Sequence, residues 1–353
     1  MSGNASTPRE VIRVAVVKKA DVIQLDGEGM LVTNDRGEPL RIDFPAIVKP
    51  AKNAVLVQGQ FMARLSVAAV TSLSVNGKKY RGLIEIYSLE DGLLVVNQLP
   101  LEEYLAGLIN CEISSQWPIE AIKSQAVIAR TYALYQRDNR KNNLYHLENS
   151  VLDQVYEGCG LEDSRAVRGV HDTAGEVLTY KGKIIQAFYH SSCGGHTEAA
   201  ANVWGAEVDY LQGVDCKYCL SSPTVRWEQS LPYRRIESLL RASGYQISGL
   251  REVIAGGHNR SGRLTDVTLL TDKGRFALSA VKFRKAVGYG VIRSTNFDLV
   301  NGDDSVRFIG AGYGHGVGLC QWGAKQRAGD GFNYREILSY YYPGTKVEQY
   351  LHE

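Results

Sequence analysis

The stretch that most constrains this chain runs from residue 99 to residue 136 and reads LPLEEYLAGLINCEISSQWPIEAIKSQAVIARTYALYQ. Pro100 stands where the first turn of a helix accepts a proline, and apolar residues follow at helical spacing as far as Ile109. Polar residues then break this pattern, and Pro118 opens a second helix. The sequence therefore predicts two helices joined at a tight polar elbow, with one acidic residue, Glu112, at the bend.

The second predicted helix carries a narrow seam of mostly small residues, which would let another element approach it closely. Its other faces carry the polar side chains of Lys123, Gln125, Arg130 and Tyr132. A carboxylate at a helix end, beside Trp117 and near basic and amide groups, could act as an acid and a base. The alternative, that Glu112 only caps a helix or forms an ion pair, stays open at this point.

The composition restricts the class of protein. A chain of 353 residues can bury a large core in one domain or two. Its net charge of +2 argues against a dedicated nucleic-acid binder, although it permits an anionic polymer as partner. No apolar run is long enough to cross a membrane. The opening MSGNASTPRE lacks the apolar core of a signal peptide, so we expect either a cytoplasmic protein or a chain from which an export signal was removed.

The first 98 residues predict a β-rich scaffold without obvious chemistry. Residues 11–17 form an apolar strand pattern, and Asn76-Gly77 and Asp91-Gly92 are hairpin signals between β-rich segments. Beyond the two helices, short strand and helix patterns alternate to the end of the chain. We therefore expect an α+β fold, with a β-rich N-terminal region in residues 1–80, a two-helix elbow, and a mixed α/β C-terminal part. Residues 81–353 would form the second domain, although no linker marks the boundary.

A group of cysteines and histidines predicts a metal site. Cys193-x-x-His196 is followed by Cys216-x-x-Cys219, and two short chelating pairs of this kind suit a tetrahedral structural Zn²⁺. His190 is a competing ligand three residues upstream. The alternatives are reduced, partly buried cysteines or a disulfide between Cys193 and Cys216. A closed set of four ligands would leave no position for a substrate, so we expect the metal to be structural.

Near the C-terminus, residues 310–323 read GAGYGHGVGLCQWG. Glycines at nearly every second position let the backbone approach another surface closely or adopt positive φ. The segment matches neither a P-loop nor a clean GxGxxG, so phosphate binding is not expected. His315 and Gln321 are its candidate functional residues, and a core histidine satisfied by backbone groups is the alternative for His315.

Four blocks carry a family resemblance: LPLEEYLAGLINCEI, EAIKSQAVIARTYAL, AFYHSSCGGHTE, and GYGHGVGLCQWGAKQRA with the trailing YYYPGT. In this order they resemble the stage II sporulation protein D family of peptidoglycan proteins, which includes the amidase enhancers of vegetative autolysin systems. The resemblance implies a lytic transglycosylase acting on glycan strands without stem peptides. It places the catalytic acid on Glu112 and a zinc in the region of residues 190–219. Trp117 and its neighbours depart from the usual methionine-proline, and Cys320 stands where a serine is usual.

The chemistry needs only one carboxylate, because the C6 hydroxyl of the substrate's N-acetylmuramyl sugar can attack C1 and give a 1,6-anhydro product. Glu112 must then start protonated, so we expect a partly desolvated setting beside Trp117. We expect a cleft between the elbow and the glycine-rich segment. The candidates for binding substrate or orienting Glu112 are Lys123, Gln125, Arg130, Tyr189, Ser192, His315 and Gln321.

Two other functions stay open. One is a non-catalytic glycan-binding protein that enhances an amidase, and the other is a zinc hydrolase that uses His190, Cys193 or Cys216 with an open metal position. The resemblance implies an extracytoplasmic protein whose partners are peptidoglycan glycan strands, with a cell-wall amidase or a membrane-bound recruiter as further candidates and no nucleic acid.

Overall fold

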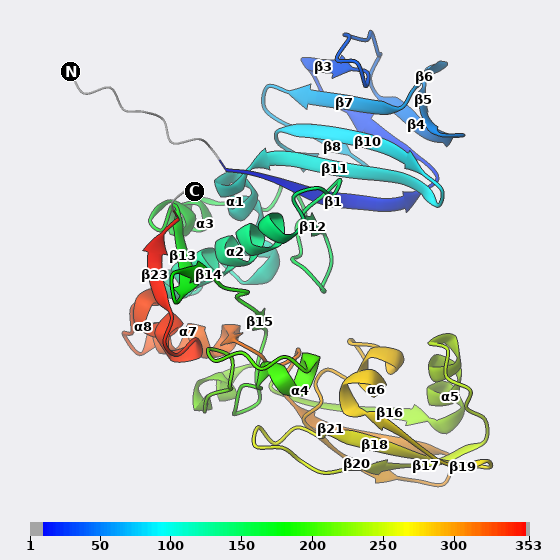
Figure 1. Ribbon diagram of the computed structural model, residues 1–353, viewed down its shortest axis with the longest axis vertical. Coiled ribbons are helices and arrows are strands. Elements are labelled where there is room, and N and C mark those ends of the chain that lie inside the picture. Colours follow the sequence, from blue (N-terminus) through cyan, green and yellow to red (C-terminus); the bar gives the residue numbers. More distant parts are fainter. Residues whose placement is uncertain (1–9, 351–353) are drawn as a thin grey trace. The chain divides into compact units, whose positions relative to one another are not determined.

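The computed structural model describes residues 10–350, and its helices and strands confirm the predicted α+β class. The chain forms two compact units (Figure 1). Of the described residues, the first unit contains 10–186 and 347–350, and the second contains 187–346. None of the helices in residues 10–350 is long and apolar enough to cross a bilayer.

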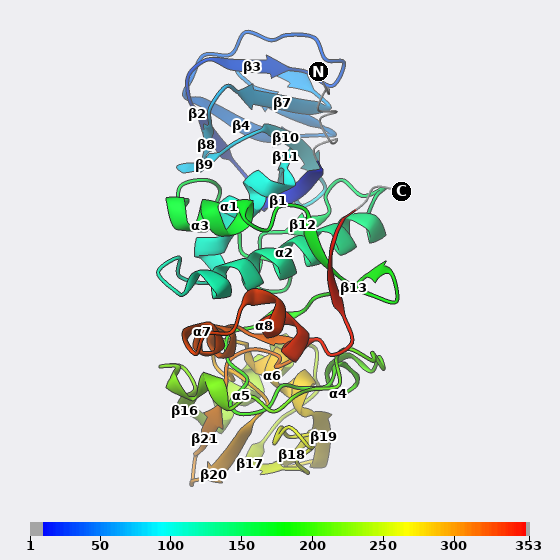
Figure 2. The ribbon, with the colours of Figure 1, turned by 90° about the vertical axis from the view of Figure 1, so that its left-hand side faces the viewer.

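Two six-stranded, mostly antiparallel sheets form the N-terminal part of the first unit (Figure 2). One sheet has the order β12 (Leu147–Glu148), β1 (Val11–Ala20), β11 (Gly92–Pro100), β10 (Leu83–Leu89), β7 (Arg64–Ala69) and β3 (Met30–Thr33). The other has the order β6 (Gln60–Met62), β5 (Ala54–Val57), β4 (Ala46–Ala51), β2 (Ile23–Asp26), β8 (Leu73–Val75) and β9 (Lys78–Tyr80). Burial alternates along strands such as β2 and β4, because one face of the sheet is in the core and the other is exposed.

The predicted boundary near residue 80 falls between β9 and β10. However, β10 pairs with β7 on one side and with β11 on the other, so one sheet continues across this point. Residues 81–100 therefore belong to the same scaffold as the strands before them.

The predicted helix pair is confirmed. β11 runs directly into α1 (Leu101–Glu112), and α2 (Ile119–Asn139) begins immediately after Pro118. Both prolines lie at the N-cap with extended ψ. α3 (Ser164–His171) packs against both helices, and it approaches α2 so closely that a Cβ on Gly169 would lie 2.4 Å from Cγ2 of Ile122. A small sheet of β14 (Lys183–Ile184), β13 (Glu176–Tyr180) and β23 (Lys346–Gln349) completes the first unit.

The second unit contains a mixed α/β module with its own core. Its two three-stranded sheets have the orders β16 (Arg226–Pro232), β21 (Ser305–Ala311), β20 (Phe297–Asn301) and β17 (Leu250–Ala255), β18 (Asp266–Thr271), β19 (Gly274–Ser279). The helices α5 (Tyr233–Ala242) and α6 (Ala280–Val287) pack against these strands. Aromatic side chains of Phe283, Phe297 and Phe308 lie at the centre of the buried cluster.

Short elements on either side of this module make up the rest of the second unit. They are β15 (Tyr189–His190), α4 (Ala200–Trp204), the 3-10 helix η1 (Lys217–Ser221), β22 (Leu319–Cys320), α7 (Gln321–Gly329) and α8 (Tyr334–Tyr341). The parallel pair of β15 and β22 joins segments that lie more than a hundred residues apart in the sequence.

Candidate active site and metal centre

Glu112 is the last residue of α1, and the chain turns to an extended conformation at Ile113. Its side chain is half-buried, and Oε1 accepts a hydrogen bond from the backbone N–H of Val155 at 3.1 Å. Tyr104 lies on the same helix, and its pKa is raised well above the usual value by burial and, in addition, by the charge of Glu112. The predicted acidic residue at the elbow therefore lies in a restricted, hydrogen-bonded setting.

Polar contacts fix the elbow itself. Ser115 donates its backbone N–H to Oδ1 of Asn110 at 2.9 Å, and its hydroxyl donates to Asp163. Asp163 also caps α3 by accepting from two backbone N–H groups, and the Ser115 hydroxyl, with these N–H groups, holds its pKa below the usual value. Arg165 donates to the carbonyls of Ser115 and Trp117 at 2.7 and 2.9 Å. α3 thus anchors the loop between α1 and α2, which sets the position at which α1 ends.

The side chain of Arg130 is buried among partners within the first unit. Its side chain is 1% exposed, and it donates to both carboxylate oxygens of Glu102 at 2.7 Å and to the carbonyls of Glu176 and Val170. These contacts tie α2 to the start of α1 and to β13. The guanidinium of Arg130 is occupied by contacts inside the first unit, which it helps to hold together, and its contact with a substrate stays a prediction.

Two further candidates lie on the same helix. Lys123 lies between Glu120 and Asp172 at 3.2 and 3.4 Å, and Gln125 is buried in α2. Their contact with a substrate stays a prediction.

The other four predicted substrate residues come together in the second unit. Tyr189 pairs with Leu319 in β15 and β22, and Ser192 exchanges two backbone hydrogen bonds with Tyr313 at 3.1 and 2.7 Å. These contacts place residues 189–192 beside the glycine-rich segment that carries His315 and leads to Gln321. Glu112 lies in the first unit, so a cleft shared between the two groups stays a prediction.

His315 resembles the core histidine that the sequence left as an alternative. Its Nδ1 accepts from the backbone N–H of Val317 at 3.0 Å, and its ring packs against Phe188, His190 and Trp204. Burial, with a smaller contribution from Arg284, lowers the pKa of His315 to about 3. The imidazole is therefore neutral near pH 7.

The glycines of this segment have the predicted role. Gly312, Gly314, Gly316 and Gly318 all have positive φ. A Cβ on Gly318 would lie 2.0 Å from the carbonyl oxygen of Phe188, and one on Gly314 would lie 2.7 Å from Cβ of His190. Only glycine allows both the conformation and this close approach to β15.

Four cysteines form the candidate metal centre. The Sγ atoms of Cys193, Cys216, Cys219 and Cys320 all lie within 4.8 Å of one another, and all four residues are buried. A tetrahedral zinc with Zn–S distances of ~2.3 Å requires sulfur atoms about 3.8 Å apart, and the sulfurs of Cys193 and Cys219 are 3.4 Å apart. Backbone N–H groups of Cys193 and Gly323 point at the sulfur of Cys320, as is typical around thiolate ligands. The donor set therefore fits a closed Zn²⁺ site.

The cluster differs from the predicted ligand set in one position. Cys320 takes the place that the sequence assigned to His196, whose Nδ1 lies 2.5 Å from the carbonyl oxygen of Thr197 and whose Nε2 lies 3.9 Å from Asp215. His190, the competing ligand, is also outside the cluster, and its Nδ1 lies 3.1 Å from the carbonyl oxygen of Val317. All six cysteines have free thiols, so the Cys193–Cys216 disulfide is not formed.

Arg263 is a functional candidate that the sequence did not indicate. Its guanidinium is fully buried and donates to the carbonyls of Cys193 at 2.9 Å and His196 at 3.2 Å. Burial lowers its pKa, whereas the charges of Cys193 and Glu198 oppose this shift. A buried cation beside the cluster is electrostatically suited to a set of thiolates, whose charge exceeds that of the metal they would hold. No sequence motif distinguishes this arginine from the others.

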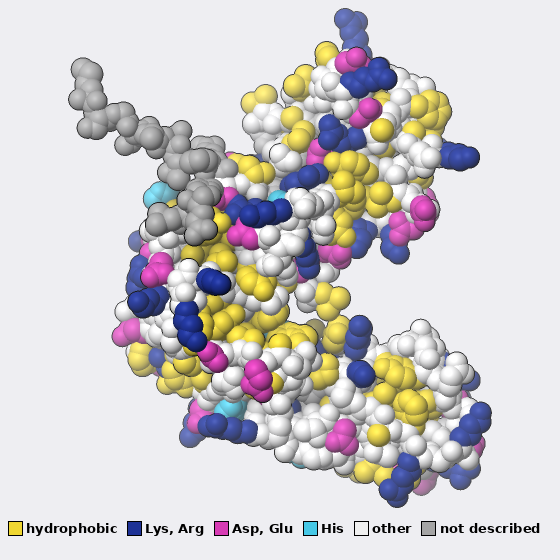
Figure 3. Space-filling view, viewed as in Figure 1, with side chains coloured by type: hydrophobic (Ala, Val, Ile, Leu, Met, Phe, Trp, Pro, Cys, Tyr) yellow, Lys and Arg dark blue, Asp and Glu magenta, His cyan; other side chains and the backbone are white. Residues whose placement is uncertain are grey.

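Charged side chains of both signs are interspersed on the face of the molecule drawn in Figure 3.

Comparisons with known proteins identify relatives of both units. The family model described as stage II sporulation protein matches residues 89–180, and a domain of unknown function (DUF8618) matches residues 212–318. An uncharacterised protein of Brachyspira hyodysenteriae is 34% identical over 78% of this chain and 74% of its own length. Two Bacillus subtilis proteins are also similar: the amidase enhancer is 29% identical over 79% of this chain, and stage II sporulation protein D is 27% identical over 72%. This chain covers 45% of the amidase enhancer's length and 76% of the sporulation protein's.

Proposed function

The chain belongs to the stage II sporulation protein D family, and from this premise we propose that it is a peptidoglycan lytic transglycosylase with Glu112 as its single acid and base. The observation that carries the proposal is the position of Glu112. It ends α1 inside the matched residues 89–180, and its Oε1 accepts the N–H of Val155. A carboxyl group held in this way keeps one orientation, in which it can act as a general acid toward a glycosidic oxygen.

The proposed reaction uses Glu112 twice. The protonated carboxyl first donates its proton to the leaving glycosidic oxygen of the N-acetylmuramyl–N-acetylglucosamine bond. The carboxylate then takes the proton of the C6 hydroxyl, whose oxygen forms the new bond to C1. The products are a 1,6-anhydro-N-acetylmuramyl end and a free sugar hydroxyl, and Glu112 recovers its proton. No water enters the products.

The neighbouring carboxylates support a mechanism with one acid, because each is engaged in another contact. Asp153 is paired with Arg140 at 3.1 Å, Glu157 contacts Lys78, and Asp163 caps α3. Glycoside hydrolysis normally requires a second carboxylate that activates water or forms a covalent intermediate. A transglycosylase does not, because the substrate supplies the nucleophile.

The metal in this proposal is structural. Zn²⁺ would be held by Cys193, Cys216, Cys219 and Cys320. Its role there would be to join three segments: the one after β15, the 3-10 helix η1, and the start of α7. Four protein ligands leave no position for a substrate or a water. This argues against the alternative of a zinc hydrolase.

The proposed substrate is the glycan strand of peptidoglycan, and we favour strands without stem peptides because of the family. The proposed location is extracytoplasmic. The similarity to an amidase enhancer suggests a cell-wall amidase as a further partner of this chain.

The test compares Glu112→Gln with the wild type on denuded glycan strands, with mass spectrometry of the products. The amide keeps the volume of the acid but cannot donate and recover a proton, so we expect a loss of rate of ~10⁴-fold or more. Glu103→Gln, in the first turn of the same helix, is the matched control and should cleave normally. Anhydro-ended products from Glu112→Gln at the wild-type rate would exclude this residue. A wild type that binds glycan without cleaving it would instead indicate a non-catalytic amidase enhancer.

A further inference from the structure

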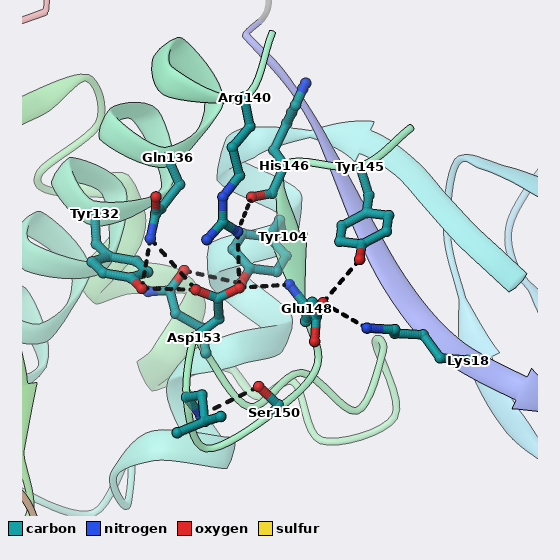
Figure 4. A network of polar contacts seen from close by, with 12 residues as sticks. Lys18, Tyr104, Tyr132, Gln136, Arg140, Tyr145, His146, Glu148, Ser150 and Asp153 are labelled. Atoms are coloured by element: carbon teal, nitrogen blue, oxygen red, sulfur yellow. Dashed lines mark hydrogen bonds and ion pairs between the residues drawn. The ribbon is translucent and has the colours of Figure 1, made fainter. Parts of the chain in front are cut away.

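The segment that follows β12 is held by a buried polar network centred on Asp153 (Figure 4). Oδ1 of Asp153 accepts from the hydroxyl of Tyr132 at 2.8 Å and from Nε2 of Gln136 at 3.4 Å. Oδ2 accepts from Nη1 of Arg140 at 3.1 Å and from the backbone N–H of Glu148 at 3.0 Å. One carboxylate thus ties its own segment to the C-terminal half of α2. The proposed chemistry uses none of these contacts.

The residues on both sides of Val155 are fixed as well. Gln154 is 1% exposed, accepts from the hydroxyl of Tyr104 at 3.0 Å, and donates to the carbonyl of Ala129 at 3.4 Å. Tyr156 donates its backbone N–H to Oδ1 of Asn149 at 2.8 Å. Val155 lies between these anchors, and its N–H is the group that reaches Oε1 of Glu112 at 3.1 Å.

We propose that Asp153 is a positioning residue for Glu112, acting through the backbone N–H of Val155. This inference rests on the proposed function of Glu112. The network on Asp153 holds the segment 153–156 against α1 and α2, so that the N–H of Val155 keeps the carboxyl in one rotamer. The same N–H stabilises the carboxylate that exists between proton donation and proton recovery, because a hydrogen bond to the charged form favours that form.

The titratable groups near Glu112 also bear on its pH profile. Tyr104 and Cys111 on α1 both interact with its charge, and burial is the main reason that their pKa values are raised. Both therefore stay uncharged near pH 7. Asp153 also carries a charge near the Tyr104 hydroxyl, and its removal in Asp153→Asn would by itself favour the carboxylate of Glu112 and lower its pKa. A shift of the alkaline limb to higher pH therefore runs against this direct effect and has to come through the segment that carries Val155.

The experiment uses the full chain with three substitutions. Asp153→Asn replaces one accepting oxygen by a donor that faces other donors, and Tyr132→Phe removes one donor while keeping the ring, in case the first variant folds poorly. Glu148→Gln is the matched control: it removes a nearby carboxylate, at the end of β12, whose side chain contacts Lys18 and Tyr145 instead (Figure 4). Thermal unfolding of each variant checks that the fold is intact.

The kinetic readout is the pH profile of glycan cleavage, together with kcat and KM measured separately. Loss of the N–H donor disfavours the carboxylate, so the alkaline limb, above which Glu112 has lost its proton, should move to higher pH in Asp153→Asn and Tyr132→Phe. We expect kcat to fall roughly ten- to a hundredfold, with KM nearly unchanged, since misplacement of a reacting group has effects of this size. Glu148→Gln should keep the wild-type profile. A wild-type profile in folded Tyr132→Phe, which keeps the charge of Asp153, would overturn the proposal.

A second readout does not depend on activity. The amide resonance of Val155 should titrate with Glu112 in the wild type and lose this titration in Glu112→Gln. In Asp153→Asn the midpoint should move to higher pH or the titration should disappear. If Val155 titrates identically in the wild type and in Asp153→Asn, Asp153 does not position Glu112. If the wild type shows the predicted amide behaviour but no cleavage, the proposed function fails and the positioning remains established.

Discussion

Replacing Cys320 by serine tests the metal centre most directly, because this residue distinguishes the observed cluster from the ligand set that the sequence predicts. The structure places Cys320 within 4.8 Å of the three other thiols, whereas the ring of His196 is directed to Thr197 and Asp215. Cys320→Ser should therefore weaken the binding of zinc strongly, and His196→Ala should not. A serine hydroxyl at this position is a poor ligand for zinc beside three thiolates.

The size of the effect follows from the number of ligands. Structural zinc sites of four ligands contribute about 10–16 kcal/mol of apparent binding free energy at pH 7, so one ligand accounts for roughly 3 kcal/mol. This corresponds to a dissociation constant about two orders of magnitude higher. Because the cluster joins three segments of the second unit, the unfolding temperature of that unit should also fall. The fold of the first unit, with α1 and Glu112, should change little.

The assay measures the zinc content of reduced protein after gel filtration, and competition with a chelator gives the affinity. Substitution by Co²⁺ adds an independent count, since the intensity of the thiolate-to-cobalt charge-transfer band rises with the number of thiolates. Four thiolates are expected in the wild type and in His196→Ala, and three in Cys320→Ser. A variant Cys320→Ser that keeps wild-type zinc affinity, together with a His196→Ala that loses it, would refute the four-cysteine site. Wild-type protein without any metal would refute the zinc itself.

Three other changes test the fold and its protonation. Burial lowers the pKa of His146 to about 4 and that of His315 to about 3, so the unfolded chain binds about one more proton at each histidine as the pH falls below ~6.5. The free energy of unfolding, measured by calorimetry, should therefore be constant above pH ~6.5 and fall steadily toward pH ~4, and His146→Phe should make this fall less steep. A wild-type protein whose stability does not change over this range would contradict the reasoning. Arg130→Met should destabilise the first unit by about 3 kcal/mol in urea unfolding, near the lower end for a broken buried pair because Glu102 is partly exposed; a loss under 1 kcal/mol would contradict its structural assignment. Gly318 has φ +72°, and a Cβ there would lie 2.0 Å from the carbonyl oxygen of Phe188, so Gly318→Ala should lower the free energy of unfolding by well over 1 kcal/mol. Gly329→Ala in α7, with open space around it, should be neutral or stabilising. Equal effects of the two substitutions would contradict the argument from close approach.

The local features of the fold could be predicted from the sequence because their causes are local. Proline before an amphipathic run determines where α1 and α2 begin, and the structure places both prolines at the N-caps. The glycine pattern near residue 315 predicts a close backbone approach, and β15 is the surface that it approaches. What the sequence could not show is which distant segment each feature meets. The continuation of one sheet across residue 80 depends on the pairing of β7 with β10, and the sequence of neither strand identifies the other as its partner.

Some residues of the candidate site could be predicted from the sequence and others could not, for the same reason. Glu112 could be identified because its neighbours in sequence define the elbow. Arg130 is a candidate for contacting a substrate or orienting Glu112 because it lies on a polar face of the second predicted helix. The structure shows that Glu102, on the preceding helix, accepts from two of its donors. The spacing of residues within one helix does not show which residue of another helix will be its partner.

Cys320 shows how a residue can be missed although its chemistry is plain. Spacing rules group ligands that are close in sequence, so His196 completed the predicted site and Cys320, more than a hundred residues further on, did not enter it. In the structure Cys320 ends β22, caps α7 and pairs with His190 of β15. These three roles explain one another, because the pairing with β15 brings Cys320 beside the segment that begins with Cys193. The cysteine cluster and the segment that carries Tyr189 and Ser192 are therefore parts of one arrangement. A metal bound by the thiols would also fix the register of the glycine-rich segment against these candidate substrate residues.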